Sequence, residues 1–136
     1  MAEIIKKHGA KFVAGFIAGA VLFAMMAFSI GSSQNAAPAR EIVLIAKDVA
    51  FRNAGEAEPA NPTIVLKQGE TVRLTLINRE PGQVLHCFSI AGLGVKTSRI
   101  LATGESETLS FSPAEKGVFS YACLMHPMMA GKILVE

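Results

Sequence analysis

The longest apolar stretch of the chain lies near its N-terminus. Residues 12–30 read FVAGFIAGAVLFAMMAFSI and contain no charged side chain. A helix of this length spans about 28 Å at 1.5 Å per residue, close to the hydrocarbon thickness of a bilayer. The pattern predicts one transmembrane helix over residues 12–30, preceded by residues 1–11 and followed by a flexible Gly-, Ser-, Asn- and Pro-containing linker over residues 31–40.

From residue 41 onward the pattern changes to short apolar or alternating segments separated by turn residues. Residues 71–77 alternate most clearly, with Val72, Leu74 and Leu76 on one face. Further strands are expected at residues 42–46, 63–66, 85–90, 108–111, 118–122 and 132–135, whereas the polar region 51–61 is expected to be a surface loop. Short strands with regular breaks are typical of an all-β sandwich, predicted here over residues 41–136.

The charges near the apolar segment predict its orientation. Lys6, Lys7 and Lys11 lie on its N-terminal side, which places that side in the cytoplasm and the remainder outside. The alternative is a cleaved secretory signal ending near residues 37–39, although such signals have shorter apolar regions of about 7–15 residues. We therefore expect a single-pass protein of the cell membrane, with its C-terminal domain on the periplasmic or extracellular side.

The charge balance argues against a nucleic-acid partner. From residue 41 onward there are nine basic and ten acidic side chains, so the exported part is nearly neutral. No basic stripe with interleaved aromatic residues is present in the sequence to follow a phosphate backbone.

Candidate metal ligands are concentrated near the C-terminus. Cys123, His126 and Met129 lie within seven residues, and His86 precedes Cys123 by 37. A thiolate, two imidazoles and a weak thioether form the ligand set of blue-copper electron-transfer sites. Met128 is an alternative thioether ligand, and zinc is a chemically possible alternative metal.

The second cysteine of the chain, Cys87, admits two interpretations. If residues 86 and 87 both lie on a strand, Cys87 points away from His86 and packs as a small apolar side chain. The alternative is a disulfide between Cys87 and Cys123, which would remove the thiolate from the metal site.

The order and spacing of these residues resemble the cupredoxins, the family of type 1 blue copper proteins. The resemblance extends through PTIVLKQGETV at residues 62–72, Asn78, HCFSI at residues 86–90 and GVFSYACLMHP at residues 117–127. The chain is most similar to the amicyanin- and plastocyanin-like electron carriers, and its Cys-x₂-His-x₂-Met spacing resembles that of the amicyanins, because the plastocyanins have a longer ligand loop. The resemblance implies a Greek-key β-sandwich that holds one mononuclear type 1 copper ion per chain.

The same resemblance implies roles for residues around the ligands. Redox donor and acceptor proteins would dock near His126, Pro127 and Met128, and Asn78 would hydrogen-bond the ligand loop near Leu124. Cys87 departs from the family pattern, in which an Asn commonly follows the first His.

The function expected from the ligands and the resemblance is single-electron transfer by a membrane-anchored carrier. The alternative is storage or delivery of Cu(I), for which Met125, Met128 and Met129 provide thioethers beside Cys123. An enzyme is not expected, because copper oxidases and nitrite reductases need a further copper with its own histidines. The only other histidine, His8, lies on the opposite side of the predicted membrane helix.

Overall fold

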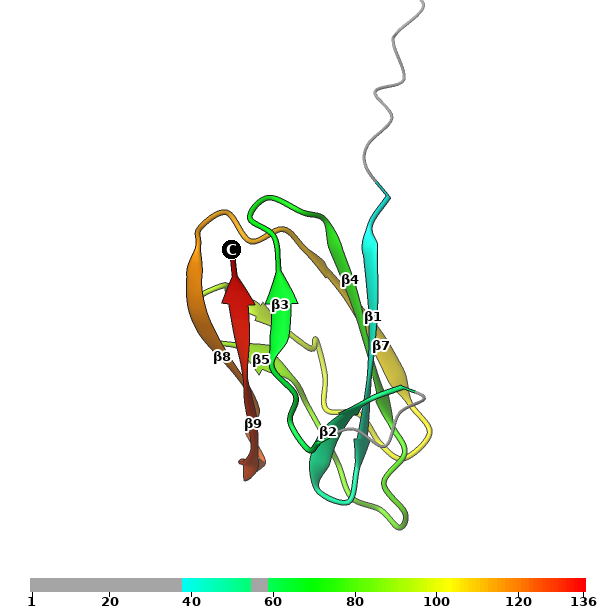
Figure 1. Cartoon of the computed structure of the whole chain (residues 1–136). Helices are drawn as coiled ribbons and strands as arrows, with labels where there is room; N and C mark the ends of the chain where they lie inside the picture. Colours follow the sequence, from blue (N-terminus) through cyan, green and yellow to red (C-terminus); the bar gives the residue numbers. More distant parts are fainter. Residues whose placement is uncertain (1–37, 55–58) are drawn as a thin grey trace, which may run out of the picture. The chain divides into compact units, whose positions relative to one another are not determined.

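The computed structural model describes residues 38–54 and 59–136, which form two facing β-sheets (Figure 1). The first sheet has the order β2-β1-β4-β7. Its strands are β1 (Arg40–Lys47), β2 (Ala50–Asn53), β4 (Val72–Asn78) and β7 (Ser106–Phe111). The second sheet has the order β3-β9-β8-β5-β6. Its strands are β3 (Ile64–Leu66), β5 (Ser89–Ile90), β6 (Val95–Lys96), β8 (Gly117–Cys123) and β9 (His126–Val135).

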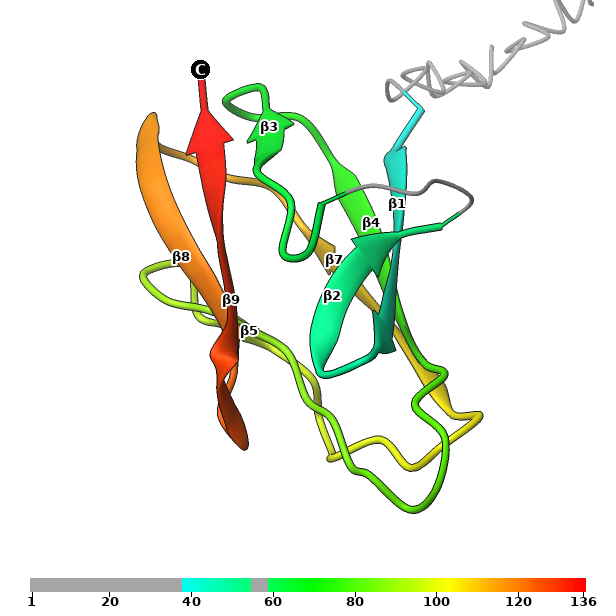
Figure 2. The same cartoon turned by 60° about the horizontal axis from the view of Figure 1, so that its bottom comes forward.

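The strand pairing mixes parallel and antiparallel neighbours. β1 pairs parallel with β4 and antiparallel with β2, while β3 pairs parallel with β9. β8 joins β5 and β9 through antiparallel ladders, and Figure 2 shows β8 and β9 running together toward one end of the domain. The prediction of an all-β architecture is confirmed for the described residues.

The predicted transmembrane helix, residues 12–30, lies outside the described residues, as do residues 1–11 and 31–37. In the part of the chain that the structure describes, no helix is long and apolar enough to cross a membrane. The membrane anchor therefore stays a prediction.

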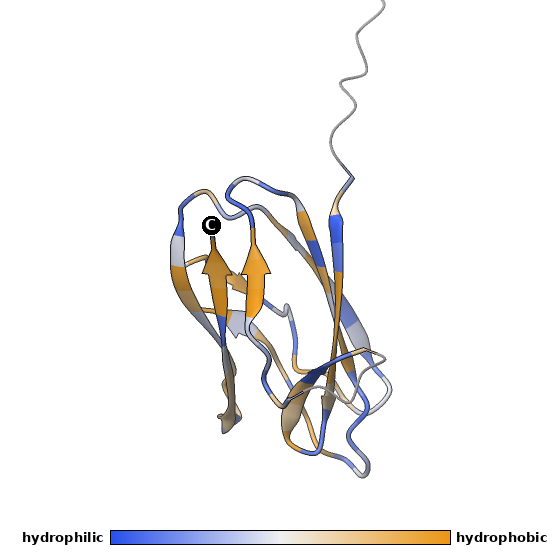
Figure 3. Ribbon diagram, in the orientation of Figure 1, coloured by the Kyte–Doolittle hydropathy of each residue, from blue (hydrophilic) through white to orange (hydrophobic). Residues whose placement is uncertain are grey.

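The core lies between the two sheets and follows the alternation of the sequence. Val72, Leu74 and Leu76 of β4 are fully buried, as their spacing predicted. Figure 3 shows apolar segments on strands of both sheets. The rings of Phe51 and Phe88 meet edge-on at a centroid distance of 5.4 Å, which links β2 to the residues just before β5.

One expectation about the strands was wrong. The region 51–61 was predicted to be a surface loop, but Ala50–Asn53 forms β2, and Phe51 is fully buried. Asp48 and Val49 form the turn before β2 with positive φ angles of 54° and 50°. This tight turn returns the chain onto β1, and the polar Arg52 and Asn53 remain partly exposed on the edge strand.

The strand expected over residues 85–90 is much shorter in the structure. Only Ser89–Ile90 belongs to a ladder, whereas His86 forms an isolated bridge with Leu101. The His86 amide donates to the Leu101 carbonyl over 3.0 Å, and the Leu101 amide donates back over 2.7 Å. His86 is therefore held by a local backbone pair rather than by a continuous strand.

Candidate metal centre

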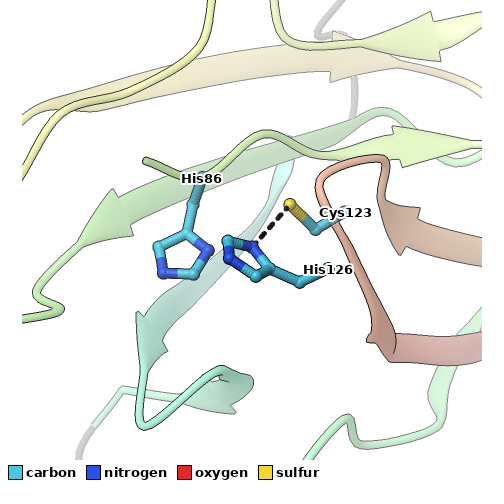
Figure 4. Close-up of side chains that lie close together, drawn as sticks. All are labelled: His86, Cys123 and His126. Atoms are coloured by element: carbon cyan, nitrogen blue, oxygen red, sulfur yellow. Dashed lines mark hydrogen bonds between the residues drawn. The ribbon is translucent and has the colours of Figure 1, made fainter. Parts of the chain in front are cut away.

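Three of the predicted ligands converge at one end of the domain. His86 precedes β5, Cys123 ends β8, and His126 begins β9. One ligand atom from each of these residues lies within 4.8 Å of the other two. Figure 4 shows the His126 ring beside the His86 ring, with the Cys123 sulfur on its other side.

A tight turn between β8 and β9 sets the spacing of two of these side chains. Cys123 pairs with His126 across the turn of Leu124 and Met125, and an irregularity at Ala122/Cys123 shifts the register there. The turn brings Cys123 Sγ to 3.6 Å from His126 Nδ1. The two histidine rings lie with their centroids 4.8 Å apart. Residues distant in the sequence thus supply a compact set of nitrogen and sulfur donors.

Burial distinguishes the two methionines that the sequence left open. Met129 is fully buried, whereas 72% of Met128 is exposed. Since Met128 and Met129 are consecutive residues of β9, their side chains point to opposite faces. Met129 is the thioether on the interior side of this strand.

His86 carries two buried nitrogen atoms that fit a metal site. The side chain is fully buried, and neither Nδ1 nor Nε2 has a hydrogen-bond partner among the described residues. Glu80 Oε2 lies 3.4 Å from Nε2, close enough for a charge contact. A buried polar atom without a partner costs free energy. Coordination of a metal by one nitrogen would satisfy it.

The environment of His86 favours the neutral imidazole that a metal requires. Burial is the main cause that lowers the pKa of His86, and the nearby His126 lowers it further. Glu80 acts in the opposite direction and raises the pKa of His86. Because proton and metal compete for the same nitrogen, a lowered pKa leaves the site ready for a cation.

Glu80 is a residue at the site that the sequence analysis missed. It is buried, and its Oε2 accepts a hydrogen bond of 3.0 Å from the Val49 amide. Its backbone amide donates to Asn78 Oδ1 over 2.9 Å. The carboxylate thereby connects the β1–β2 turn to the imidazole of His86. A lone Glu six residues before a His gives no signal of this contact in the sequence.

Asn78 does not have the partner expected from the family resemblance. It was expected to bond the ligand loop near Leu124, but its Nδ2 donates to the carbonyls of Val84 and Leu101, each over 2.9 Å. Leu101 is the residue that pairs with His86. Asn78 therefore stabilises the backbone on the His86 side of the site.

Cys87 supplies the bond to the ligand loop instead. Its Sγ accepts a hydrogen bond of 3.3 Å from the Leu124 amide, and its own amide donates to Cys123 Sγ over 3.4 Å. The two sulfur atoms lie 3.6 Å apart and both thiols are free. Burial is the main cause that raises the pKa of the Cys87 thiol. Cys87 thus lies next to Cys123, a predicted metal ligand, and is more than an apolar packing residue.

Asn61 is a second residue that the sequence analysis missed. Its Nδ2 donates to the carbonyl of Met128 over 3.1 Å, and its Oδ1 accepts from the Phe51 amide over 3.0 Å. Its φ of 53° is left-handed, a conformation that Asn tolerates better than most residues. An Asn before a Pro gives a turn signal but does not reveal a contact with β9.

The surface around His126 is apolar. His126 itself is half-buried, and the neighbouring Leu124, Met125 and Met128 expose 78%, 46% and 72% of their surfaces. We call Leu124, Met125, Pro127 and Met128 the His126 patch. Large exposed apolar side chains that gather around one polar group are typical of an interaction surface.

The fold and the donor set together define a cupredoxin copper protein. A family model described as cupredoxin-like domain matches residues 20–135, so the chain belongs to this family. The cofactor predicted from the sequence, one mononuclear type 1 copper ion per chain, is confirmed by this membership together with the convergent histidine and cysteine ligands.

Individual relatives agree with this membership. The chain is 34% identical over 77 residues to amicyanin from Paracoccus denitrificans, an alignment that covers 55% of this chain and 56% of that protein. It is similar to a solution structure of a copper binding protein in the apo form, with 28% identity and a TM-score of 0.53, covering 71% of this chain and 86% of the other. Auracyanin from Roseiflexus castenholzii shares the fold, with 17% identity and a TM-score of 0.57, covering 72% and 98% of the two chains.

Proposed function

We propose that this chain carries single electrons through one copper ion, which would be held by His86, Cys123 and His126 together with the thioether of Met129. The observation that carries the proposal is the convergence of two imidazoles and a thiol within 4.8 Å. The buried Nδ1 of His86, which has no hydrogen-bond partner among the described residues, and the fully buried Met129 support it. The similarity to a copper binding protein supports the choice of metal.

Each ligand type suits this role for a chemical reason. When bound, copper supplies a one-electron couple between Cu(II) and Cu(I). A soft thiolate and two imidazoles bind both oxidation states, and a long thioether contact tolerates both. The protein holds these donors from different directions: the Leu101 bridge fixes His86, and the β8–β9 turn fixes Cys123 with His126. A scaffold that keeps the donors in place limits the rearrangement that accompanies electron transfer.

The His126 patch is the proposed docking surface for a redox donor and a redox acceptor. His126 is the only one of the four proposed ligands that is not fully or almost fully buried. Its imidazole therefore offers the shortest protein path between a bound copper and the surface. Apolar side chains around the ring, Pro127 and Met128 among them, would exclude water when a partner docks.

The membrane anchor and the side of the membrane are also part of the proposal. The sequence of residues 12–30 supports a single-pass anchor, and the flanking lysines support a cytoplasmic N-terminus. The copper domain would then face the periplasmic or extracellular side. Tethering raises its local concentration near membrane-bound redox partners.

A second candidate function is storage or delivery of Cu(I). The observation that favours it is the exposure of Met125 and Met128 beside the site, because thioethers are suitable ligands for Cu(I). An enzyme is not favoured. Among the described residues His86 and His126 are the only histidines, so no second histidine-rich copper site is available there.

The test is an optical spectrum of the full chain in detergent, loaded with Cu(II), before and after reduction with ascorbate. We expect an intense visible thiolate-to-copper band that bleaches on reduction and returns on oxidation. Cys123→Ser should abolish the band, and Met129→Leu should shift it, whereas the matched control Met128→Leu should leave it unchanged. A chain that binds Cu(I) tightly but shows no reversible band would establish the storage function instead.

A further inference from the structure

We propose that Cys87 and Cys123 form a reversible dithiol–disulfide couple in the copper-free chain, and that closure of the disulfide prevents copper binding. The proposal rests on the proposed role of Cys123 as the copper thiolate. It adds a two-electron chemistry to the same sulfur atom and a role for Cys87, which copper coordination leaves unused.

The geometry of the two thiols carries this inference. Their sulfur atoms lie 3.6 Å apart, so formation of a bond of about 2.05 Å needs an approach of about 1.5 Å. The Cys87 amide already donates to Cys123 Sγ, and the Leu124 amide donates to Cys87 Sγ. These bonds keep the two sulfurs beside each other, so closure of the disulfide requires only a further approach of the two side chains.

Access to the pair is from the Cys87 side. Cys87 lines an open groove together with Leu124, Met125, Lys96 and Arg99. Cys87 is itself only 8% exposed, and Cys123 is 2% exposed and does not line this groove. A small-molecule disulfide in the groove would therefore meet Cys87 first. Because burial raises the pKa of the Cys87 thiol, this attack is slower than at an exposed cysteine.

The oxidant in this scheme is a low-mass disulfide, R–S–S–R. The Cys87 thiolate attacks one sulfur of R–S–S–R, forms a mixed disulfide and releases one R–S⁻. The Cys123 thiolate then attacks Cys87 Sγ, forms the Cys87–Cys123 bond and releases the second R–S⁻. Both leaving thiolates take up the protons that the two cysteines lost. The chain is oxidised by two electrons, and the small disulfide is reduced to two thiols.

Copper and disulfide exclude each other because both use Cys123 Sγ. A disulfide sulfur is not the thiolate that a type 1 site requires. A copper-bound Cys123 has no free thiolate for the second attack. The chain would therefore accept copper only in its reduced form, and bound copper would block closure of the Cys87–Cys123 disulfide.

The test starts from the reduced, copper-free full chain in detergent, incubated to equilibrium with oxidised glutathione. We expect the loss of both titratable thiols, the loss of two hydrogen atoms in the intact mass, and the loss of the visible band on addition of Cu(II). A phosphine reductant should restore thiols and band together. A copper-loaded sample should keep its band under the same oxidation.

Two single variants separate the steps. Cys87→Ser, the matched control, should keep its single thiol after the oxidation, and whatever band the reduced variant forms with Cu(II) should be the same before and after the treatment. Cys123→Ser should accumulate a glutathione adduct at Cys87. Three results for the unmodified chain would each overturn the proposal. They are two titratable thiols after the oxidation, a glutathione adduct that persists, and copper binding by the closed disulfide. Failure of the reduced chain to form a visible band would count against the electron-transfer function itself, so the two failures are distinguishable.

Discussion

The charge of Glu80 lies close enough to the site to set its reduction potential. Its Oε2 is 3.4 Å from His86 Nε2, and both side chains are buried. Glu80→Gln keeps an oxygen that can accept from the Val49 amide but removes one negative charge. A negative charge near copper stabilises Cu(II) relative to Cu(I), so we expect the variant to have a higher reduction potential.

The size of this effect follows from Coulomb's law. A copper ion bound by the ring nitrogen of His86 that faces away from Glu80 would lie about 7 Å from this charge, since 3.4 Å separates Oε2 from Nε2 and a metal–imidazole bond adds about 2 Å beyond the ring. At an effective dielectric constant of about 20, one charge at this distance contributes about 2 kcal/mol. For a one-electron couple this corresponds to an increase of about 100 mV, since about 59 mV equals a tenfold change.

Spectroelectrochemical titration of the visible band would measure the shift. The matched control is Glu41→Gln, because Glu41 is exposed and pairs with Arg73 over 3.4 Å on the first sheet, without a contact to the site. The control carries the same change in net charge, so we expect little change in its potential. Equal potentials for the two variants, or a lower potential for Glu80→Gln, would refute the electrostatic reasoning.

Three further predictions concern the scaffold of the site. Gly131→Ala places a Cβ in steric conflict with the buried ring of Tyr121. We expect it to lower the free energy of unfolding, measured with urea, by about 1–3 kcal/mol. Asn61→Ala removes the donor to the Met128 carbonyl and should lower the stability by about 1–2 kcal/mol and shift the visible band. The third concerns pH: because the pKa of His86 is lowered by folding, the copper-free chain should lose stability as the pH falls below about 6.5 toward the folded pKa, as measured by urea unfolding.

Controls for these variants come from the same chain. Gly82→Ala adds a Cβ with no atom within 4 Å at a φ of 80°, so it reports backbone strain without a steric conflict. It should lower the free energy of unfolding by less than Gly131→Ala does. Asn61→Asp keeps the acceptor for the Phe51 amide but replaces the donor to Met128 with a charged carboxylate oxygen, so it should be at least as destabilising as Asn61→Ala. A His86→Asn chain with the same acid-dependent loss of stability would show that another group is responsible.

Much of the fold was predictable because a strand that buries one face has alternating apolar and polar residues in its sequence. The alternation of residues 71–77 predicted the buried face of β4, which the structure confirms. β2 was not predictable in this way, since only Ala50 and Phe51 of its four residues are buried and it lies at the sheet edge. Its pairing depends on the turn at Asp48 and Val49, which contains no glycine.

The candidate site was predictable in part for a different reason. Cys123 and His126 are close in the sequence, and the spacing required by a tight turn is visible there. Contacts between distant segments are not encoded by spacing. Cys87 and Cys123 are distant in the sequence, and their proximity depends on the break in the strand before β5, where His86 bridges Leu101. Glu80 and His86 are only six residues apart, but both lie outside the strands, so no regular spacing indicates their contact.

The start of β9, which contains His126 and Met129, is held by contacts with residues that do not belong to the β8–β9 hairpin. Asn61 binds the Met128 carbonyl, and Tyr121 donates to the Pro62 carbonyl over 2.6 Å. Tyr121 also lies directly opposite Gly131, where only a glycine leaves space for its ring. The segment before β3 is therefore attached to both β8 and β9. Because these contacts involve no metal, they hold the start of β9 in the copper-free chain and would reduce its movement when the copper changes its oxidation state.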